Sequence, residues 1–291
     1  MKRLTQLKTL LPWSRLMRWR QPTDLGILWI LGLWGWQLGS QNSTALGSLP
    51  LLLLSLFILR TLAWLILDVV IAVLEHPQYS VFKILAKLPV ALRWFVVVLL
   101  FFCLVILLWL GWQALLIAAV AALLAGLFLY VRHYSFLGEL LLALSLACVT
   151  LLGFAATGTP LGKTAWLIYT VAVLWLSACL MQYAALHLQE HIRLGINSIT
   201  MLFGRADRWI IALLQALALI SFGLLGQQEK LGMFMHIAIA VGFALGIYQQ
   251  YLMAAASERG YRRAWRNNLW FGLALLCGLT FQALCLCPSV A

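Results

Sequence analysis

Residues 91–131 read ALRWFVVVLLFFCLVILLWLGWQALLIAAVAALLAGLFLYV, a nearly unbroken apolar segment. Arg93 is its single charged side chain, and Gly111 divides it into two apolar runs. A helix that crosses a bilayer needs about 20 consecutive, mostly apolar residues. The stretch therefore predicts two membrane-spanning helices joined by a break at Gly111.

The composition of the whole chain agrees with this prediction. The chain has 291 residues, of which 64% are hydrophobic and 10% are charged, and its mean hydropathy is +0.99. A soluble domain is about 45–50% apolar and about 25% charged, and one of this size could not bury so much apolar surface. We therefore exclude a cytosolic enzyme, a disordered chain and a nucleic-acid-binding protein, although the net charge is +12.

Divided at charged and Gly- or Pro-rich breaks, the chain predicts an all-α, polytopic membrane domain over residues 22–291. The expected spans are residues 22–39, 48–74, 91–110, 113–131, 136–156, 164–186, 208–226, 231–254 and 269–287. Residues 1–21 are basic and amphipathic and lack a small-residue cleavage site, so we expect an interfacial segment rather than a signal peptide.

The distribution of positive charge predicts the orientation of these nine spans. With alternating loops, 17 of the 20 Lys and Arg residues fall on the side of the N-terminus, Lys163 and Lys230 fall on the other, and Arg60 lies within a span. Loops rich in Lys and Arg stay in the cytoplasm. We therefore expect a multi-pass protein of a bacterial-type inner membrane with a cytoplasmic N-terminus.

The second span contains three ionisable side chains, Arg60, Asp68 and Glu75. Charged groups inside a bilayer are costly and usually mark function. Their separations of eight and seven residues place all three near one face of a helix. They form either a functional site or a structural ion pair in which Arg60 neutralises a neighbouring carboxylate.

A second polar cluster ends the sixth span, where residues 179–198 read CLMQYAALHLQEHIRLGINS. His187 and His191 are four residues apart and could face one metal ion or one anion. His187-x-x-Glu190-His191 also matches the inverted zinc-peptidase pattern, but that chemistry needs a further ligand in a hydrolytic fold. We favour an anion-facing surface formed by Tyr183, His187, Glu190, His191 and Arg193.

At this cluster the sequence resembles the UbiA superfamily of intramembrane aromatic prenyltransferases, most closely its 4-hydroxybenzoate polyprenyltransferase branch. The matching segments are Arg15-Leu16-Met17-Arg18 with Pro22, Gln182-Tyr183-Ala184, Gly195-Ile196-x-Ser198, Leu202-Phe203-Gly204-Arg205-x-Asp207, Tyr248-Gln249-Gln250, and Asn267-Asn268 with Gly272. The resemblance implies about nine helices around a central cavity. It also implies two aspartate-rich motifs whose Mg²⁺ ions hold the diphosphate of a polyprenyl donor.

Both motifs depart from the family pattern. The first, N-D-x-x-D-x-x-x-D, matches Leu67-Asp68-x-x-Ile71-x-x-x-Glu75. The second, D-x-x-Y-A-x-x-D-x-x-x-D, matches Leu180-x-x-Tyr183-Ala184-x-x-His187-x-x-x-His191. Four of the six aspartates are therefore replaced by apolar or imidazole side chains, whereas Mg²⁺ prefers oxygen ligands.

Near the expected cavity the sequence retains few carboxylate side chains and many basic ones. If Mg²⁺ binds, its protein ligands would be Asp68, Glu75 and Glu190. Arg60 and Arg132 occupy basic positions of the family, and we expect a cationic rim that attracts an anionic head group. The members of that rim would be Lys83, Lys87, His187, His191 and Arg193.

Three hypotheses follow. The first is a non-catalytic family member, a pseudoenzyme without a metal cofactor, that binds a quinone, polyprenyl or other lipid among the membrane lipids and acts as an accessory subunit of a membrane complex. The second is an active 4-hydroxybenzoate polyprenyltransferase-like enzyme of ubiquinone biosynthesis with a reduced Mg²⁺ site, in which Asp68, Glu75 and Arg132 are catalytic. The third is a metal or haem site at His187 and His191.

Overall fold

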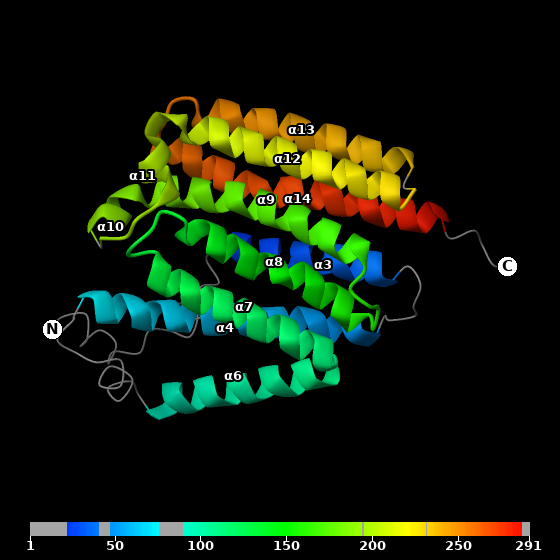
Figure 1. Cartoon of the computed structure of the whole chain (residues 1–291), viewed down its shortest axis with the longest axis horizontal. Helices are drawn as coiled ribbons and strands as arrows, with labels where there is room; N and C mark the ends of the chain where they lie inside the picture. Colours follow the sequence, from blue (N-terminus) through cyan, green and yellow to red (C-terminus); the bar gives the residue numbers. More distant parts are fainter. Residues whose placement is uncertain (1–21, 41–46, 76–89, 194, 231, 287–291) are drawn as a thin grey trace.

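The computed structural model describes residues 22–40, 47–75, 90–193, 195–230 and 232–286. Within these ranges every long element is an α-helix, and the helices lie side by side along the long axis of the molecule (Figure 1). The long helices are α3 (Pro22–Gly39), α4 (Ser48–Glu75), α6 (Val90–Trp109), α7 (Trp112–Val131), α8 (Gly138–Ala156), α9 (Lys163–Leu186), α12 (Asp207–Gln228), α13 (Met233–Met253) and α14 (Glu258–Leu286).

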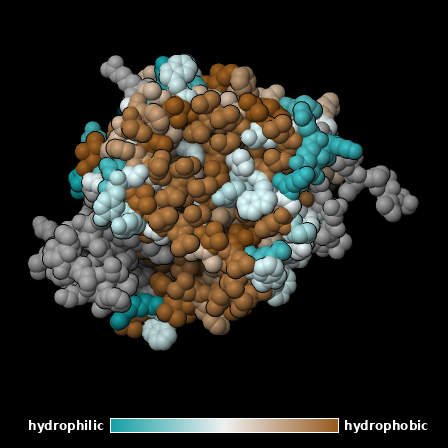
Figure 2. Space-filling model, in the orientation of Figure 1, coloured by the Kyte–Doolittle hydropathy of each residue, from teal (hydrophilic) through white to brown (hydrophobic). Residues whose placement is uncertain are grey.

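These helices confirm the all-α membrane fold expected from the sequence. Six of them are long and apolar enough to cross a membrane by length and composition. Hydrophobic side chains also cover most of the face shown in Figure 2, and hydrophilic ones lie mainly toward its edges. The expected interfacial segment, residues 1–21, lies outside the described residues.

The last helix differs from the expected boundary. We expected a span from residue 269, but α14 begins at Glu258 and includes Arg259, Arg262 and Arg263 in its first turns. The alternation of charged and apolar residues there allows Tyr261 and Ala264 to pack against the protein while the arginines stay exposed. Tertiary packing therefore extends the helix beyond its apolar run.

Close packing of α3 against α8 depends on two glycines. A Cβ atom at Gly35 would overlap the carbonyl group of Thr150, and one at Gly153 would overlap the carbonyl oxygen of Gly32. In a bilayer, helices associate mainly through such close contacts, because lipid is as apolar as the side chains. The contact joins the first helix of the described chain to the centre of the bundle.

Four aromatic residues connect the helices at the centre of the protein. Trp34 of α3 lies 5.0 Å from Trp175 of α9 and 6.2 Å from Phe222 of α12, between ring centroids. Trp175 in turn stacks at 6.0 Å on Phe271 of α14. All four are fully buried. Large rings of this kind contribute both buried area and ring–ring attraction.

A network of buried amide side chains holds α9, α12, α13 and α14 together. Oε1 of Gln249 accepts hydrogen bonds from Nε2 of Gln182 and of Gln215, both at 2.7 Å. Nε2 of Gln249 donates to Asn267 at 3.1 Å and to Asn268 at 3.3 Å, and Asn268 donates back to Gln182 at 2.7 Å. The network fixes the part of α9 that precedes the polar cluster.

Two connections meet at the same end of the bundle. The short helices α10 (Leu188–Arg193) and α11 (Ile199–Phe203) link α9 to α12. In this connection the backbone nitrogen of Asn197 donates to the carbonyl of Arg132 at 2.9 Å. The side-chain nitrogen Nδ2 of Asn197 donates to the carbonyl of His133, also at 2.9 Å. The α7–α8 turn is thereby attached to the segment that carries the second motif.

Candidate functional site

The aromatic part of the site lies where α9 ends. Tyr183 is in the last turn of α9, and its ring centroid lies 4.2 Å from that of His187. His187 is the C-cap residue, and its Nδ1 lies 3.0 Å from the carbonyl oxygen of Tyr183. On its other side Tyr183 packs against Trp265 of α14 at 5.3 Å.

His191 keeps the helical spacing expected from the sequence. Its backbone nitrogen donates to the carbonyl of His187 at 3.0 Å, so the chain continues with helical geometry into α10. Nδ1 of His191 is buried and has no hydrogen-bond partner among the described residues. Burial, then the charges of Arg132 and His187, lowers the pKa of His191 to about 4.

This pKa corrects one expectation. The rim was expected to be cationic at His191, but a group with this pKa is neutral at neutral pH. Half-buried imidazole beside a cation resists protonation because water cannot solvate the added charge. His191 therefore presents a neutral ring with a buried nitrogen to its surroundings.

The lowered pKa predicts acid sensitivity. The unfolded chain takes up a proton at the ordinary histidine pKa of about 6.5, whereas folded His191 does so only near 4, so stability falls as pH drops through this interval. We expect the melting temperature of His191→Asn in detergent to fall less than that of the parent between pH 7 and pH 4.5. His236→Asn, at an exposed position of α13, is the control and should behave like the parent. Equal acid sensitivity of the parent and His191→Asn would contradict the assignment.

Arg132 follows α7 directly and is buried, with 8% of its surface exposed. Its guanidinium lies 4.9 Å from the ring centroid of Phe128, and its Nε has no hydrogen-bond partner among the described residues. Burial lowers the pKa of Arg132, while the nearby Glu139 and Tyr183 raise it. The guanidinium nonetheless stays charged.

Glu139 was missed in the reading of the sequence. It lies in the first turn of α8 and is buried, with 8% exposed. Its Oε2 accepts a hydrogen bond from the backbone nitrogen of Ile199 at 3.3 Å, and its carboxylate also bonds to the Ser198 side chain. The signal that could have identified it is its position, because Glu139 is an ionisable residue inside the expected span 136–156. A charged group inside a membrane span is costly and usually marks function.

The structure describes the side chains of only some of the other residues expected at the site. Arg60 is buried in α4 with 4% exposed, whereas Glu190 and Arg193 are exposed on α10. The backbone of α4 carries Asp68 and Glu75, but their side chains lie outside the described residues, as does Lys83 with the whole segment 76–89. The structure therefore brings together Arg132, Tyr183, His187 and His191, and adds Glu139.

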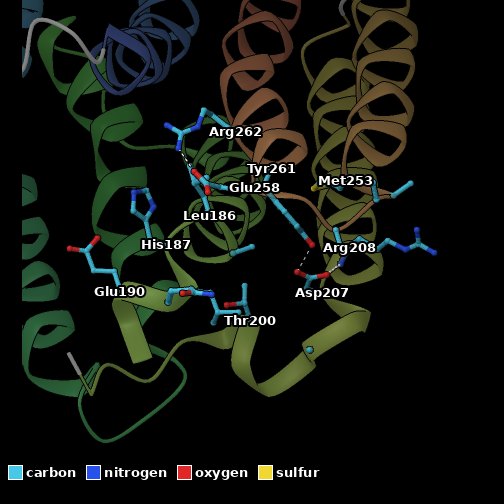
Figure 3. A pocket seen from close by; sticks show the side chains of 17 residues that line it. Leu186, His187, Glu190, Thr200, Asp207, Arg208, Met253, Glu258, Tyr261 and Arg262 are labelled. Carbon is cyan, nitrogen blue, oxygen red and sulfur yellow. Dashed lines mark hydrogen bonds and ion pairs between the residues drawn. The ribbon is translucent and has the colours of Figure 1, made fainter. Parts of the chain in front are cut away.

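A cavity of about 980 Å³ opens beside this cluster, at the surface between α9, α10, α11, α12 and the α13–α14 turn (Figure 3). His187 and Glu190 line it on one side, and Asp207 and Tyr261 line it on the other. Asp207 accepts hydrogen bonds from the Tyr261 hydroxyl at 2.7 Å and from the backbone nitrogen of Arg208 at 2.5 Å. Both oxygens of this carboxylate are therefore engaged in holding the wall of the cavity.

The second motif does not fit Mg²⁺. Its three aspartate positions hold Leu180, which is buried, and the two histidines His187 and His191. Mg²⁺ requires hard oxygen ligands in octahedral geometry. Across the described side chains, no three His, Cys, Asp or Glu residues gather closely enough to hold a metal ion. The second motif therefore lacks the oxygen ligands that Mg²⁺ needs.

Comparison with known proteins agrees with the fold. Residues 87–280 match the UbiA prenyltransferase family. A Marinobacter nauticus protein named 4-hydroxybenzoate octaprenyltransferase is 34% identical over 161 residues, which are 55% of this chain and 55% of that protein. A Coxiella burnetii protein of the same name is 32% identical over 163 residues, 56% of this chain and 57% of that protein. The chain thus matches about half the length of these curated relatives.

Solved structures resemble the chain over most of its length. The apo structure of a UbiA homolog from Aeropyrum pernix K1 superposes with a TM-score of 0.70 at 18% identity and covers 89% of this chain and 98% of its own. A UbiA homolog from Archaeoglobus fulgidus bound to GPP and Mg²⁺ gives a TM-score of 0.59 at 13% identity, with 91% and 99% covered. At these identities the likeness establishes the fold.

Proposed function

We propose, from the premise that this chain belongs to the UbiA prenyltransferase family, that it binds an isoprenoid or quinone lipid in the membrane without transferring a prenyl group. Multi-pass membrane insertion and family membership are the starting points. A lipid-binding member of this kind suits a role as an accessory subunit of a membrane complex. The cytoplasmic position of its N-terminus belongs to the same proposal.

The observation that carries the proposal is the set of side chains at the second motif. Imidazoles and a leucine stand where the family has carboxylates, and His191 is neutral at neutral pH. Cleavage of an allylic diphosphate develops negative charge on the leaving group, and metal ions offset that charge in metal-dependent transfer. Removal of one electrostatic stabiliser typically slows an enzyme by about 100–1000-fold. Several of the family's carboxylates are replaced in this chain.

The test is an assay of the purified full-length chain in lipid nanodiscs. Geranyl diphosphate, 4-hydroxybenzoate and Mg²⁺ are supplied, and the Marinobacter nauticus relative is assayed in parallel. We expect the rate of product formation to be at least about 1000-fold below that of the relative. Transfer at a comparable rate that is abolished by Asp68→Ala would establish the active enzyme instead.

Restoring the replaced aspartates provides the matched variant. A chain carrying Ile71→Asp, Leu180→Asp, His187→Asp and His191→Asp should gain Mg²⁺-dependent binding of geranyl diphosphate that the parent lacks. Isothermal titration with and without EDTA measures this gain, and the elution profile in detergent checks that the variant is folded. Equal Mg²⁺-dependent binding by the parent would refute the proposal.

The orientation is tested by labelling. One end of the bundle carries the described arginines of the α7–α8 turn, α10, α12 and the start of α14. The opposite end carries Lys163, at the start of α9, and Lys230, just after α12. Loops rich in positive charge stay in the cytoplasm. We expect a cysteine placed at Ala255 to react with an impermeant maleimide only in inverted vesicles, and one placed at Gly162 only in intact cells.

A further inference from the structure

The charges buried at the end of α7 and the start of α8 balance each other. Arg132 and Glu139 are each 8% exposed, and each acts on the other electrostatically. Glu139 accepts a hydrogen bond from the backbone nitrogen of Ile199, so it is fixed beside Arg132 by the α10–α11 connection. The positive charge of Arg132 is therefore partly neutralised before any ligand arrives.

The same cluster contains two buried nitrogen atoms that have no partner among the described residues, Nε of Arg132 and Nδ1 of His191. Buried polar groups are nearly always hydrogen-bonded, and a buried donor without a partner destabilises the protein. The Arg132 Nε always carries a proton, and an imidazole such as that of His191 can carry one on Nδ1. Two buried donors thus lie within one electrostatic cluster.

We propose that Arg132 and His191 donate these hydrogen bonds to an uncharged isoprenoid head group bearing carbonyl oxygens, as a quinone does, and that Glu139 disfavours an isoprenoid diphosphate. The inference rests on the lipid-binding function proposed above and names the chemical class of its ligand. A carbonyl oxygen accepts a hydrogen bond without bringing charge into the protein. It therefore satisfies the two donors at a small desolvation cost.

A diphosphate meets a different balance of interactions. Its several negative charges would need cations, but the carboxylate of Glu139 is fixed next to Arg132 and repels those negative charges. Like charges held close together in a protein repel strongly enough to change an affinity by about tenfold. Glu139 is thus the residue that selects against the charged head group.

The experiment compares two ligands in nanodiscs by the quenching of intrinsic tryptophan fluorescence. One ligand is a benzoquinone with a two-isoprene tail, and the other is geranyl diphosphate without Mg²⁺. We expect the parent to bind the quinone at least about tenfold more tightly than the diphosphate. Glu139→Gln keeps an oxygen to accept from Ile199 but removes the charge, so it should strengthen diphosphate binding about tenfold and change quinone binding little.

Two further variants separate this selection from a general disturbance. Arg132→Lys keeps the positive charge but lacks the Nε donor, and should weaken quinone binding about tenfold. Glu229→Gln, at the opposite end of the bundle where Glu229 accepts from the Thr164 hydroxyl, is the matched control and should change neither affinity. Melting temperatures show whether each variant is folded.

The outcomes distinguish this inference from the function on which it rests. If the parent prefers the diphosphate, or if Glu139→Gln leaves the preference unchanged while the fold is intact, the inference is wrong even though no prenyl transfer occurs. If neither ligand binds, or if Mg²⁺-dependent transfer is measured, the proposed function itself has failed.

Discussion

Gly35→Ala should lower the free energy of unfolding by more than about 3 kcal/mol, because the added methyl group has no space between α3 and α8. Its Cβ would overlap the carbonyl oxygen of Thr150 and lie 2.8 Å from the carbonyl carbon, and backbone cannot move aside as a flexible side chain can. Overpacking of a well-packed core typically costs about 1–3 kcal/mol, and here two helices must separate along a shared face. Thermal unfolding in detergent measures the loss.

Gly126 of α7 provides the control for this prediction. A Cβ atom at Gly126 would meet nothing within 4 Å, so Gly126→Ala changes the same residue type to the same side chain without a clash. Alanine favours a helix over glycine by about 1 kcal/mol, so this variant should be as stable as the parent or slightly more stable. Equal melting temperatures for the two variants would show that α3 and α8 are not packed as described.

Gln249→Leu should cost roughly 3–6 kcal/mol of stability, the second large effect. Gln249 is fully buried and bonds to Gln182, Gln215, Asn267 and Asn268. Leucine has nearly the same size but leaves several buried donors and acceptors without partners, and each orphan costs about 1–3 kcal/mol. The expected result is a large drop in melting temperature with retained helix content at low temperature.

Gln215→Leu is the matched comparison within the same network. Gln215 makes one hydrogen bond to Gln249, and its own oxygen has no partner among the described residues. Its replacement therefore removes one hydrogen bond but also one buried oxygen that has no partner among the described residues. The free energy of unfolding should fall by less than about 2 kcal/mol. If Gln215→Leu destabilises the protein as much as Gln249→Leu, the network is not organised around Gln249.

The helices could be predicted from the sequence because each bilayer span is a local property. Long apolar runs such as residues 91–131 fix helix number, type and approximate ends without reference to the rest of the chain. The start of α14 could not be predicted in this way. Its first turns are Arg-rich, and they are helical because Tyr261 and Ala264 pack against neighbouring helices.

The site was predictable only in part. The spacing of His187 and His191 placed both on one turn, and the structure keeps that relation. The position of Arg132 beside them depends on Asn197, which bonds to the α7–α8 turn from more than 60 residues away in the chain. The spacing of apolar and polar residues along the chain does not indicate such a long-range contact. The same holds for Glu139, whose partner Ile199 lies in the other connection.

The organisation of the amides around Gln249 has a consequence for which substitutions this protein tolerates. Replacing Gln249, unlike Gln215, leaves several buried partners unsatisfied at once, so an acceptable change at that position would have to be accompanied by further substitutions at its partners. Positions 180, 187 and 191 are not part of this hydrogen-bonded network, so a change there leaves the amide bonds in place. A substitution at the rim can therefore leave the buried amides, and the helix packing that they hold, unchanged.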